Sequence, residues 1–194
     1  DLTGPGCKLS SPYEVESGSV IGASSLTLED CFVPDADLFQ KPGEAFARAL
    51  SSINAARTHV AAMCCGMVGE ALAIATEYGR GRQAFGKPVS EHQGMRWSIA
   101  DIATALERAR LLTYRSANLV QTGGDAIIPA AMAKKEAVEM ATWCLPACMQ
   151  MMGANGLLSE YPIARHILSV RIAACVDGTT EIQNDRIGQM TARG

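Results

Sequence analysis

From residue 44 onward, apolar residues recur at steps of three, four or seven, which is the spacing of one face of an α-helix. The first stripe contains Phe46, Leu50, Ile53, Val60, Cys64, Met67, Ala71 and Ile74. A second contains Met95, Ile99, Ile102, Leu106 and Ala109, and a third, after Pro129, contains Ala133, Met140, Cys144, Ala147 and Met151. Short glycine-containing breaks at 79–88, 123–125 and 153–156 separate the stripes. The pattern predicts an antiparallel helical bundle with three long helices, followed by two shorter helices over 163–174 and from about residue 180.

Residues 1–42 have a different pattern. Ser, Gly, Pro, Thr and Val recur there, and residues 25–28 alternate polar and apolar side chains as a strand does. This region is too short to form a stable sheet alone. We therefore expect residues 1–42 to be the end of a β domain with its linker, and residues 43–194 to be an α-helical bundle domain.

Composition narrows the class of protein. The 194 residues are 48% hydrophobic with a net charge of −3, which supplies a buried core and does not suggest a nucleic-acid partner. We recognise no membrane helix and no signal peptide, so we expect no membrane partner. Seven scattered cysteines disfavour a disulfide framework and favour a reducing, cytoplasmic location. Cys144 and Cys148 lack further ligands at metal spacing, so we interpret them as core residues and expect no metal site.

Two polar features stand out against the apolar stripes. Thr180 and Gln183 match a capping box, and the preceding Asp177-Gly178 pair predicts a tight bend before a helix that begins near Thr180. An acid beside a helix N-terminus can act as a base or help to hold an anion, although Asp177 and Thr180 could also serve only as caps. Arg57 lies on the first apolar stripe, so it needs a partner or a cavity unless it snorkels from the edge of the stripe.

Three stretches resemble one known family when they are taken together. They are residues 82–88 (RQAFGKP) with His92-Gln93, residues 150–156 (QMMGANG) with residues 160–162 (EYP), and residues 177–179 (DGT). In order and spacing they resemble the acyl-CoA dehydrogenase family, from about Leu26 to the end of the chain. The resemblance implies a C-terminal helical domain preceded by the tail of the middle β domain.

The resemblance also implies a chemistry. Such enzymes remove the α-hydrogen of an acyl-CoA as a proton and pass the β-hydrogen as hydride to FAD, which leaves a 2,3-enoyl-CoA. Asp177 matches the position of the catalytic base, and Arg57 and Gly178 are expected to contact the substrate. The residues expected to contact FAD are Arg82, Phe85, Gln93, Gln150, Gly153, Thr179 and Glu181. A guanidinium suits a diphosphate, and glycine lets the backbone approach it closely.

The resemblance further implies partners and assembly. The family's FAD site is shared between subunits, so a homodimer or tetramer is expected, or a heteromeric assembly. The electron acceptor that the resemblance implies is an electron-transferring flavoprotein.

The chain departs from the family pattern at three places. Asp177 stands where most members carry glutamate, which keeps the carboxylate and shortens its arm. Some relatives place the base just before the arginine of the first helix, where this chain has Ala56. Leu168-Ser169 replaces a usual Arg-Asp pair. These departures leave two alternatives open: a non-catalytic subunit that supports assembly or cofactor binding, and a related flavin oxidase that uses Asp as its base on nitroalkanes.

Overall fold

The computed structural model describes residues 2, 4–14 and 23–193, and it divides the chain into two compact units, Asp1–Leu50 and Ser51–Gly194. In the first unit, β1 (Cys7–Leu9) pairs antiparallel with β2 (Leu26–Leu28). The register places Cys7 opposite Leu28, and the short helix η1 (Asp35–Asp37) follows. The strand expected at residues 25–28 is therefore confirmed.

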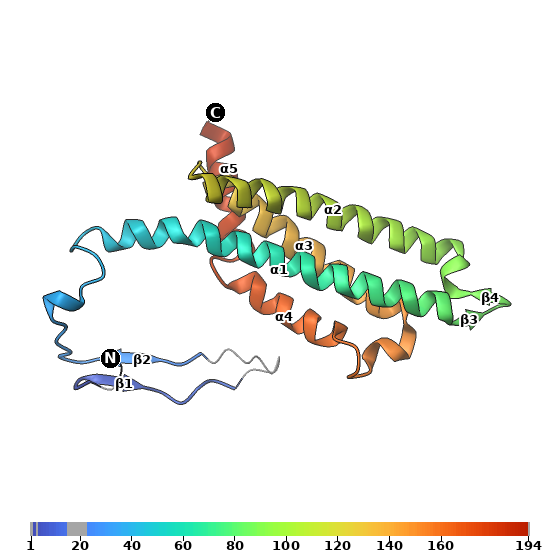
Figure 1. The fold of residues 1–194 in the computed structure, drawn as a ribbon, viewed down its shortest axis with the longest axis horizontal. Helices are drawn as coiled ribbons and strands as arrows, with labels where there is room; N and C mark the ends of the chain where they lie inside the picture. Colours follow the sequence, from blue (N-terminus) through green and yellow to red (C-terminus); the bar gives the residue numbers. More distant parts are fainter. Residues whose placement is uncertain (1, 3, 15–22, 194) are drawn as a thin grey trace. The chain divides into compact units, whose positions relative to one another are not determined.

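The helical part is built from five helices within the described residues (Figure 1). They are α1 (Ala45–Gly81), α2 (Gln93–Thr122), α3 (Ile127–Met151), α4 (Ile163–Cys175) and α5 (Thr180–Arg193). A hairpin of β3 (Gln83–Ala84) and β4 (Lys87–Pro88) and the short helix η2 (Val89–Glu91) join α1 to α2. The short helix η3 (Gly153–Leu157) follows α3. The predicted fold class, a mostly α antiparallel bundle with a short β remnant, is confirmed.

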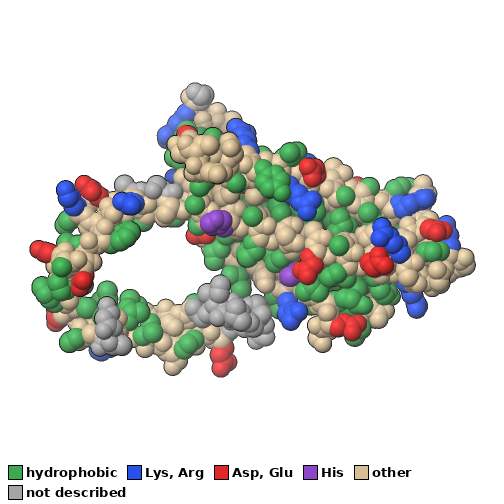
Figure 2. Space-filling view, viewed as in Figure 1, with side chains coloured by type: hydrophobic (Ala, Val, Ile, Leu, Met, Phe, Trp, Pro, Cys, Tyr) green, Lys and Arg blue, Asp and Glu red, His purple; other side chains and the backbone are tan. Residues whose placement is uncertain are grey.

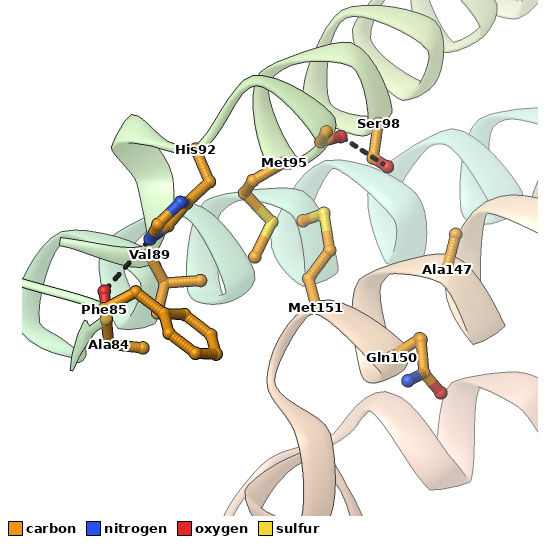
Figure 3. Close-up of a pocket in the computed structure, with 10 residues that line it drawn as sticks. Ala84, Phe85, Val89, His92, Met95, Ser98, Ala147, Gln150 and Met151 are labelled. Carbon is orange, nitrogen blue, oxygen red and sulfur yellow. Dashed lines mark hydrogen bonds between the residues drawn. The ribbon is translucent and has the colours of Figure 1, made fainter. Parts of the chain in front are cut away.

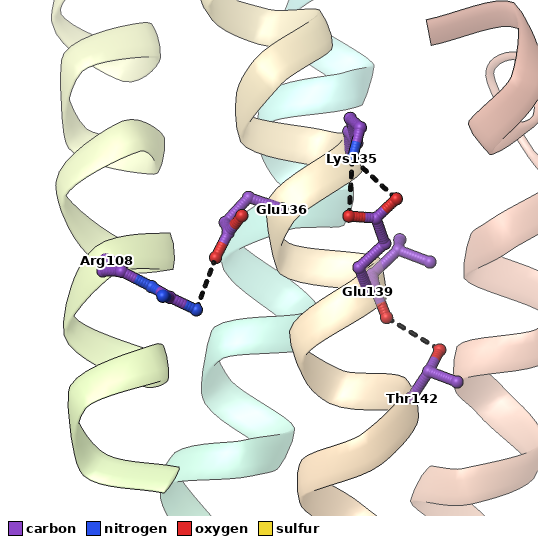
Figure 4. A network of polar contacts seen from close by, with 6 residues as sticks. Arg108, Lys135, Glu136, Glu139 and Thr142 are labelled. Carbon is purple, nitrogen blue, oxygen red and sulfur yellow. Dashed lines mark hydrogen bonds and ion pairs between the residues drawn. The ribbon is translucent and has the colours of Figure 1, made fainter. Parts of the chain in front are cut away.

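Contacts between the long helices show the antiparallel packing. The hydroxyls of Thr58 on α1 and Ser116 on α2 lie 2.6 Å apart, and further along α1 Cys65 lies 3.8 Å from Thr113. Residue numbers thus rise along one helix as they fall along the other. Between α2 and α3, the exposed Arg108 forms an ion pair with the half-buried Glu136 at 3.3 Å (Figure 4).

The core of the helical unit is made largely of small side chains. Its buried alanines are Ala61, Ala71, Ala75, Ala105, Ala109, Ala133, Ala137, Ala141 and Ala173. The predicted stripes supply part of the remainder, including Cys64, Met140 and Cys144. Cys148 is also buried in this core, so the interpretation of Cys144 and Cys148 as core residues is confirmed. Figure 2 shows hydrophobic, acidic and basic side chains interspersed on the visible face of this unit.

Two expectations about the stripes need correction. Phe46 was expected on the core face of α1 but is 74% exposed, because it lies in the first unit, where the described residues build no core around it. The side chain of Leu50 lies outside the described part. The third helix begins at Ile127 rather than after Pro129, because the first turn of a helix tolerates proline.

The expectation about membrane segments also needs correction. Residues Ser52–Gly81 of α1 are long and apolar enough, by length and composition, to cross a membrane. Half of the most apolar window is buried inside the protein, and the core helix of a soluble protein passes the same test. The apolar face of α1, including Val60 and Val68, packs in the bundle core.

Candidate functional site

The turn between α4 and α5 carries Asp177. The helix α4 ends at Cys175, and both Asp177 (φ 54°) and Gly178 (φ 92°) adopt left-handed backbone conformations before α5 begins at Thr180. Aspartate tolerates this region better than most residues, and glycine enters it freely. The predicted bend and the predicted start of the last helix are confirmed.

Lys134 and Arg57 donate hydrogen bonds to this turn from two other helices. Lys134 on α3 is 1% exposed, and its Nζ donates to the carbonyl oxygens of Val176 and Gly178. Arg57 on α1 is 5% exposed, and its Nε donates to the carbonyl oxygen of Asp177 at 3.0 Å. The buried arginine of the first stripe therefore has a partner, and it does not snorkel to solvent.

Gln183 on α5 supplies a third donor. Its buried Nε2 donates to the carbonyl oxygens of Asp177 at 3.3 Å and Gly178 at 3.0 Å. In a capping box this side chain would instead reach the backbone N–H of Thr180, so the start of the helix was correct but the role of Gln183 was not. Its Oε1 is buried and has no hydrogen-bond partner among the described residues.

Positive charge gathers around the turn. Burial lowers the pKa of Lys134, the charge of Asp177 raises it, and the charge of Arg57 lowers it again. Burial likewise lowers the pKa of Arg57, with a further lowering by Arg186 and an opposing effect of Asp177. The charge of Asp177 thus acts on two buried cations, and Asp177 itself is half-buried.

The residues that follow the turn line a cavity of about 510 Å³. Thr179 and Glu181 lie on its wall together with Trp143 of α3 and Arg171 of α4. A hydrogen bond from the hydroxyl of Thr179 lowers the pKa of Glu181, so this carboxyl is held in its charged form.

A second candidate region lies where the β3–β4 hairpin meets α2 and α3 (Figure 3). A cavity of about 430 Å³ is lined there by Phe85, His92, Met95, Gln150 and Met151, among others. The ring of Phe85, at the tip of the hairpin, is 98% exposed and stands edge-on to His92. His92 Nε2 lies 3.0 Å from the carbonyl oxygen of Ala84 and ties the hairpin to the start of α2.

The other residues expected to contact FAD lie close in the sequence to residues that line this second cavity. Arg82 is exposed between α1 and β3, and its carbonyl accepts a hydrogen bond from the N–H of Val89 at 2.8 Å. Gln93 is exposed as the first residue of α2. Gly153 is exposed at the start of η3, with φ 59°. The structure thus divides the predicted site residues between two places, the turn and the hairpin.

Comparison with known proteins identifies the family. Residues 43–191 match the family model described as acyl-CoA dehydrogenase, C-terminal domain. The chain belongs to the acyl-CoA dehydrogenase family. The resemblance inferred from the three sequence stretches is therefore confirmed.

Known proteins and solved structures are similar to most of the chain. Human mitochondrial short-chain specific acyl-CoA dehydrogenase is 38% identical over 160 residues, which are 82% of this chain and 39% of that protein. Butyryl-CoA dehydrogenase from Megasphaera elsdenii superposes with a TM-score of 0.91 at 31% identity, over 97% of this chain and 49% of that one. PigA, solved with FAD and proline, gives 0.92 at 27% identity, over 98% of this chain and 50% of that one. The chain therefore spans between about two fifths and one half of the length of these three proteins.

Sequence reasoning missed Lys134 and Gln183 as residues of the candidate site. Lys134 follows Ala133 and precedes Ala137 on the apolar stripe of α3, which is the same signal that drew attention to Arg57 on α1. Gln183 stood out in the sequence because it follows Thr180 by three residues, but a capping box explained that spacing equally well. His92 was part of the family-like stretch, and the structure adds its contact with the hairpin.

Proposed function

We propose that this chain is the C-terminal part of an FAD-dependent acyl-CoA dehydrogenase in which Asp177 is the catalytic base. The observation that carries the proposal is the turn itself: a carboxylate at the family's base position, on a backbone held by buried donors from α1, α3 and α5. Catalysis of proton transfer depends on such fixed placement, because about 1 Å of displacement can cost on the order of 100-fold in rate.

The proposed reaction is an α,β-desaturation. The carboxylate of Asp177 takes the α-proton of the acyl thioester, and the β-hydrogen leaves with its electron pair, so a carbon–carbon double bond forms and the product is a 2,3-enoyl-CoA. FAD, when bound, supplies the acceptor for that hydride. Gly178 brings the backbone of the turn close to the substrate, and Arg57 places positive charge beside it.

The chain's own residues fit a flavin dinucleotide. Arg82 is exposed and offers a planar cation for a diphosphate, and Gly153 offers a backbone without a side chain. Phe85 supplies an apolar ring and Gln150 an amide to the wall of one cavity, and Gln93 lies between two lining residues in the sequence. Thr179 and Glu181 line the other cavity, near the base. These residues form two separate groups, one at the hairpin and one at the turn. Such an arrangement suits a cofactor that is shared between subunits, so we propose a homodimer or tetramer, or a heteromeric assembly.

The names of the relatives support a proposal for the substrate. Several are named for short-chain acyl-CoA substrates, so we propose a short acyl-CoA such as butyryl-CoA. An electron-transferring flavoprotein is the proposed acceptor of the electrons, and a cytoplasmic location suits the free cysteines of the chain.

The test uses the complete protein that carries this chain, purified with FAD under anaerobic conditions. Addition of butyryl-CoA should bleach the visible flavin absorbance and yield crotonyl-CoA, detected by mass spectrometry. A flavoprotein that no acyl-CoA reduces would contradict the proposal and favour the assembly subunit. Rapid reoxidation by O₂ after reduction by a nitroalkane, with no response to acyl-CoA, would favour the oxidase, an alternative suggested by Asp177 at the base position.

A further inference from the structure

We propose that Lys134 is a positioning residue for Asp177, which fixes the place of the carboxylate by holding the two carbonyls on either side of it. This inference rests on the proposed function, because it assigns a role in the proton abstraction by Asp177. The closing experiment therefore separates the two claims.

The contacts of Lys134 bracket Asp177. Its Nζ donates to the carbonyl oxygens of Val176 and Gly178, while Arg57 Nε donates to the carbonyl oxygen of Asp177 between them. Three consecutive carbonyl groups are thereby fixed from the bundle core. Left-handed conformations at two successive residues point these carbonyls away from the regular helix pattern, so they need donors from elsewhere.

Lys134 is a poor choice of residue for packing alone. Its neighbours along α3 are the buried residues Ala130, Ala131, Ala137 and Val138, and a lysine in such surroundings loses hydration of its charge. Burial lowers the pKa of Lys134, and Asp177 is the carboxylate whose charge opposes that change. An apolar side chain of similar length would fill the same space without this cost. The chain instead keeps an ammonium group that can donate to more than one acceptor at once.

Gln183 shows that the turn does not depend on Lys134 for all its hydrogen bonds. Its Nε2 also donates to the carbonyl of Gly178, so that carbonyl keeps a partner if the lysine is replaced. The carbonyl of Val176, directly before Asp177, loses the donor that Lys134 supplies. We therefore expect a variant of Lys134 to fold with a turn that has become less well defined on the N-terminal side of Asp177.

The adjacent residue offers a matched control. Lys135 lies on the same helix, but it is half-buried and pairs with Glu139 one turn along α3, at 2.6 Å (Figure 4). Lys135→Met removes the same charge from the same helix without touching the turn. Lys134→Met keeps the length of the side chain and removes its donors, and Lys134→Gln keeps an amide donor on a shorter arm.

The experiment measures flavin reduction by butyryl-CoA in the complete FAD-loaded protein by stopped-flow absorbance, and hydrogen exchange of the peptide covering residues 174–183. For Lys134→Met we expect the rate constant per bound flavin at saturating substrate to fall about 100-fold. The dissociation constant for butyryl-CoA should change less than about twofold, because loss of positioning affects the transition state. Exchange should become faster in the 174–183 peptide of the FAD-free protein as well, and Lys135→Met should match the wild type in every measurement.

The outcomes separate the claims. A structural role alone would lower flavin content or the melting temperature and leave the rate per bound flavin unchanged, which overturns the positioning role. If Lys134→Met does not fold, Lys134→Gln decides. Its arm is one bond shorter, so we expect its amide to lose the carbonyl of Val176 and the rate to fall, and a wild-type rate in that variant also overturns the positioning role. Asp177→Asn is measured in parallel: if it reduces flavin as the wild type does, the proposed function fails, whereas a slow Asp177→Asn beside a fast Lys134→Met refutes only the role of Lys134.

Discussion

Gly178 is the residue at which the turn depends most on the absence of a side chain. Its φ is +92°, and a Cβ at this position would lie 2.9 Å from Nε2 of Gln183 and 3.5 Å from Nη2 of Arg57. A substitution would therefore strain the backbone and press on the donor of Gln183, with a further tight contact at 3.3 Å from Cγ2 of Ile182, whereas the approach to Arg57 is an ordinary contact. Gly188 on α5 is a contrasting case, because no atom lies within 4 Å of a Cβ placed there.

We predict that Gly178→Ala lowers the free energy of unfolding by about 1–3 kcal/mol, through backbone strain and the close contact with Gln183. Gly188→Ala should raise the same free energy by about 0.5–1 kcal/mol, because alanine is the better helix former. Urea denaturation of the two variants checks both signs. Equal effects of the two substitutions would show that the turn is not constrained as described.

The candidate site was predictable at some residues and not at others. Asp177-Gly178 was recognisable as a bend because its signal is local, and Arg57 was recognisable because a charge interrupted an apolar stripe. The partners were not predictable, because Arg57 meets a carbonyl 120 positions away and Lys134 meets carbonyls 42 and 44 positions away. Only the packing of α1, α3 and α5 brings these groups together. The assigned roles of the predicted site residues stay predictions.

At the scale of the elements, small side chains let the helices pack closely. Ala109 on α2 is fully buried in the core, whereas Ala103, on the same helix, is exposed. The period of 3.6 residues predicted these helices and their inward faces. It did not predict that Phe46 would be exposed, because periodicity shows which face of a helix is apolar and not whether other residues cover that face.

We predict that Ala109→Leu lowers the free energy of unfolding by about 1–3 kcal/mol, because a closely packed core cannot accept three additional carbon atoms without moving the backbone. Ala103→Leu should change it by less than about 0.5 kcal/mol. Chemical denaturation monitored by circular dichroism compares the two. A neutral Ala109→Leu would mean that the space between the helices is looser than the buried alanines indicate.

At the scale of the whole molecule, buried thiols connect stability to pH. Burial raises the pKa of Cys64 and Cys144 from 9.0 to about 12 and that of Cys148 to about 11. When the pH lies between 9.0 and these raised pKa values, the thiols lose their protons in the unfolded chain but keep them in the folded protein. The stability contributed by each thiol is therefore complete below pH 9 and is lost as the pH rises toward 11 or 12. Lys134 acts in the opposite direction, because its pKa is lowered by burial.

We predict that the protein loses stability between about pH 8 and pH 10, with roughly 1 kcal/mol lost for each of these thiols. The double substitution of Cys144 and Cys148 by Ala should reduce that loss by about 2 kcal/mol, although it lowers stability at pH 8 by creating space in the core. Urea denaturation at the two pH values gives the comparison. An unchanged pH dependence in the double variant would contradict the assignment to these thiols.

The proposed mechanism depends most on the base at position 177, and the contacts of Asp177 allow its side chain to be tested separately from its backbone. Arg57 and Gln183 bind the backbone carbonyl of Asp177, so replacing its side chain leaves their hydrogen bonds in place. The decisive measurement is stopped-flow reduction of the bound flavin by butyryl-CoA in Asp177→Asn. We predict that flavin stays bound while its reduction slows by about 100- to 10,000-fold, with part of the rate kept in Asp177→Glu. Reduction of the flavin in Asp177→Asn at the wild-type rate would contradict the role of Asp177 as the base.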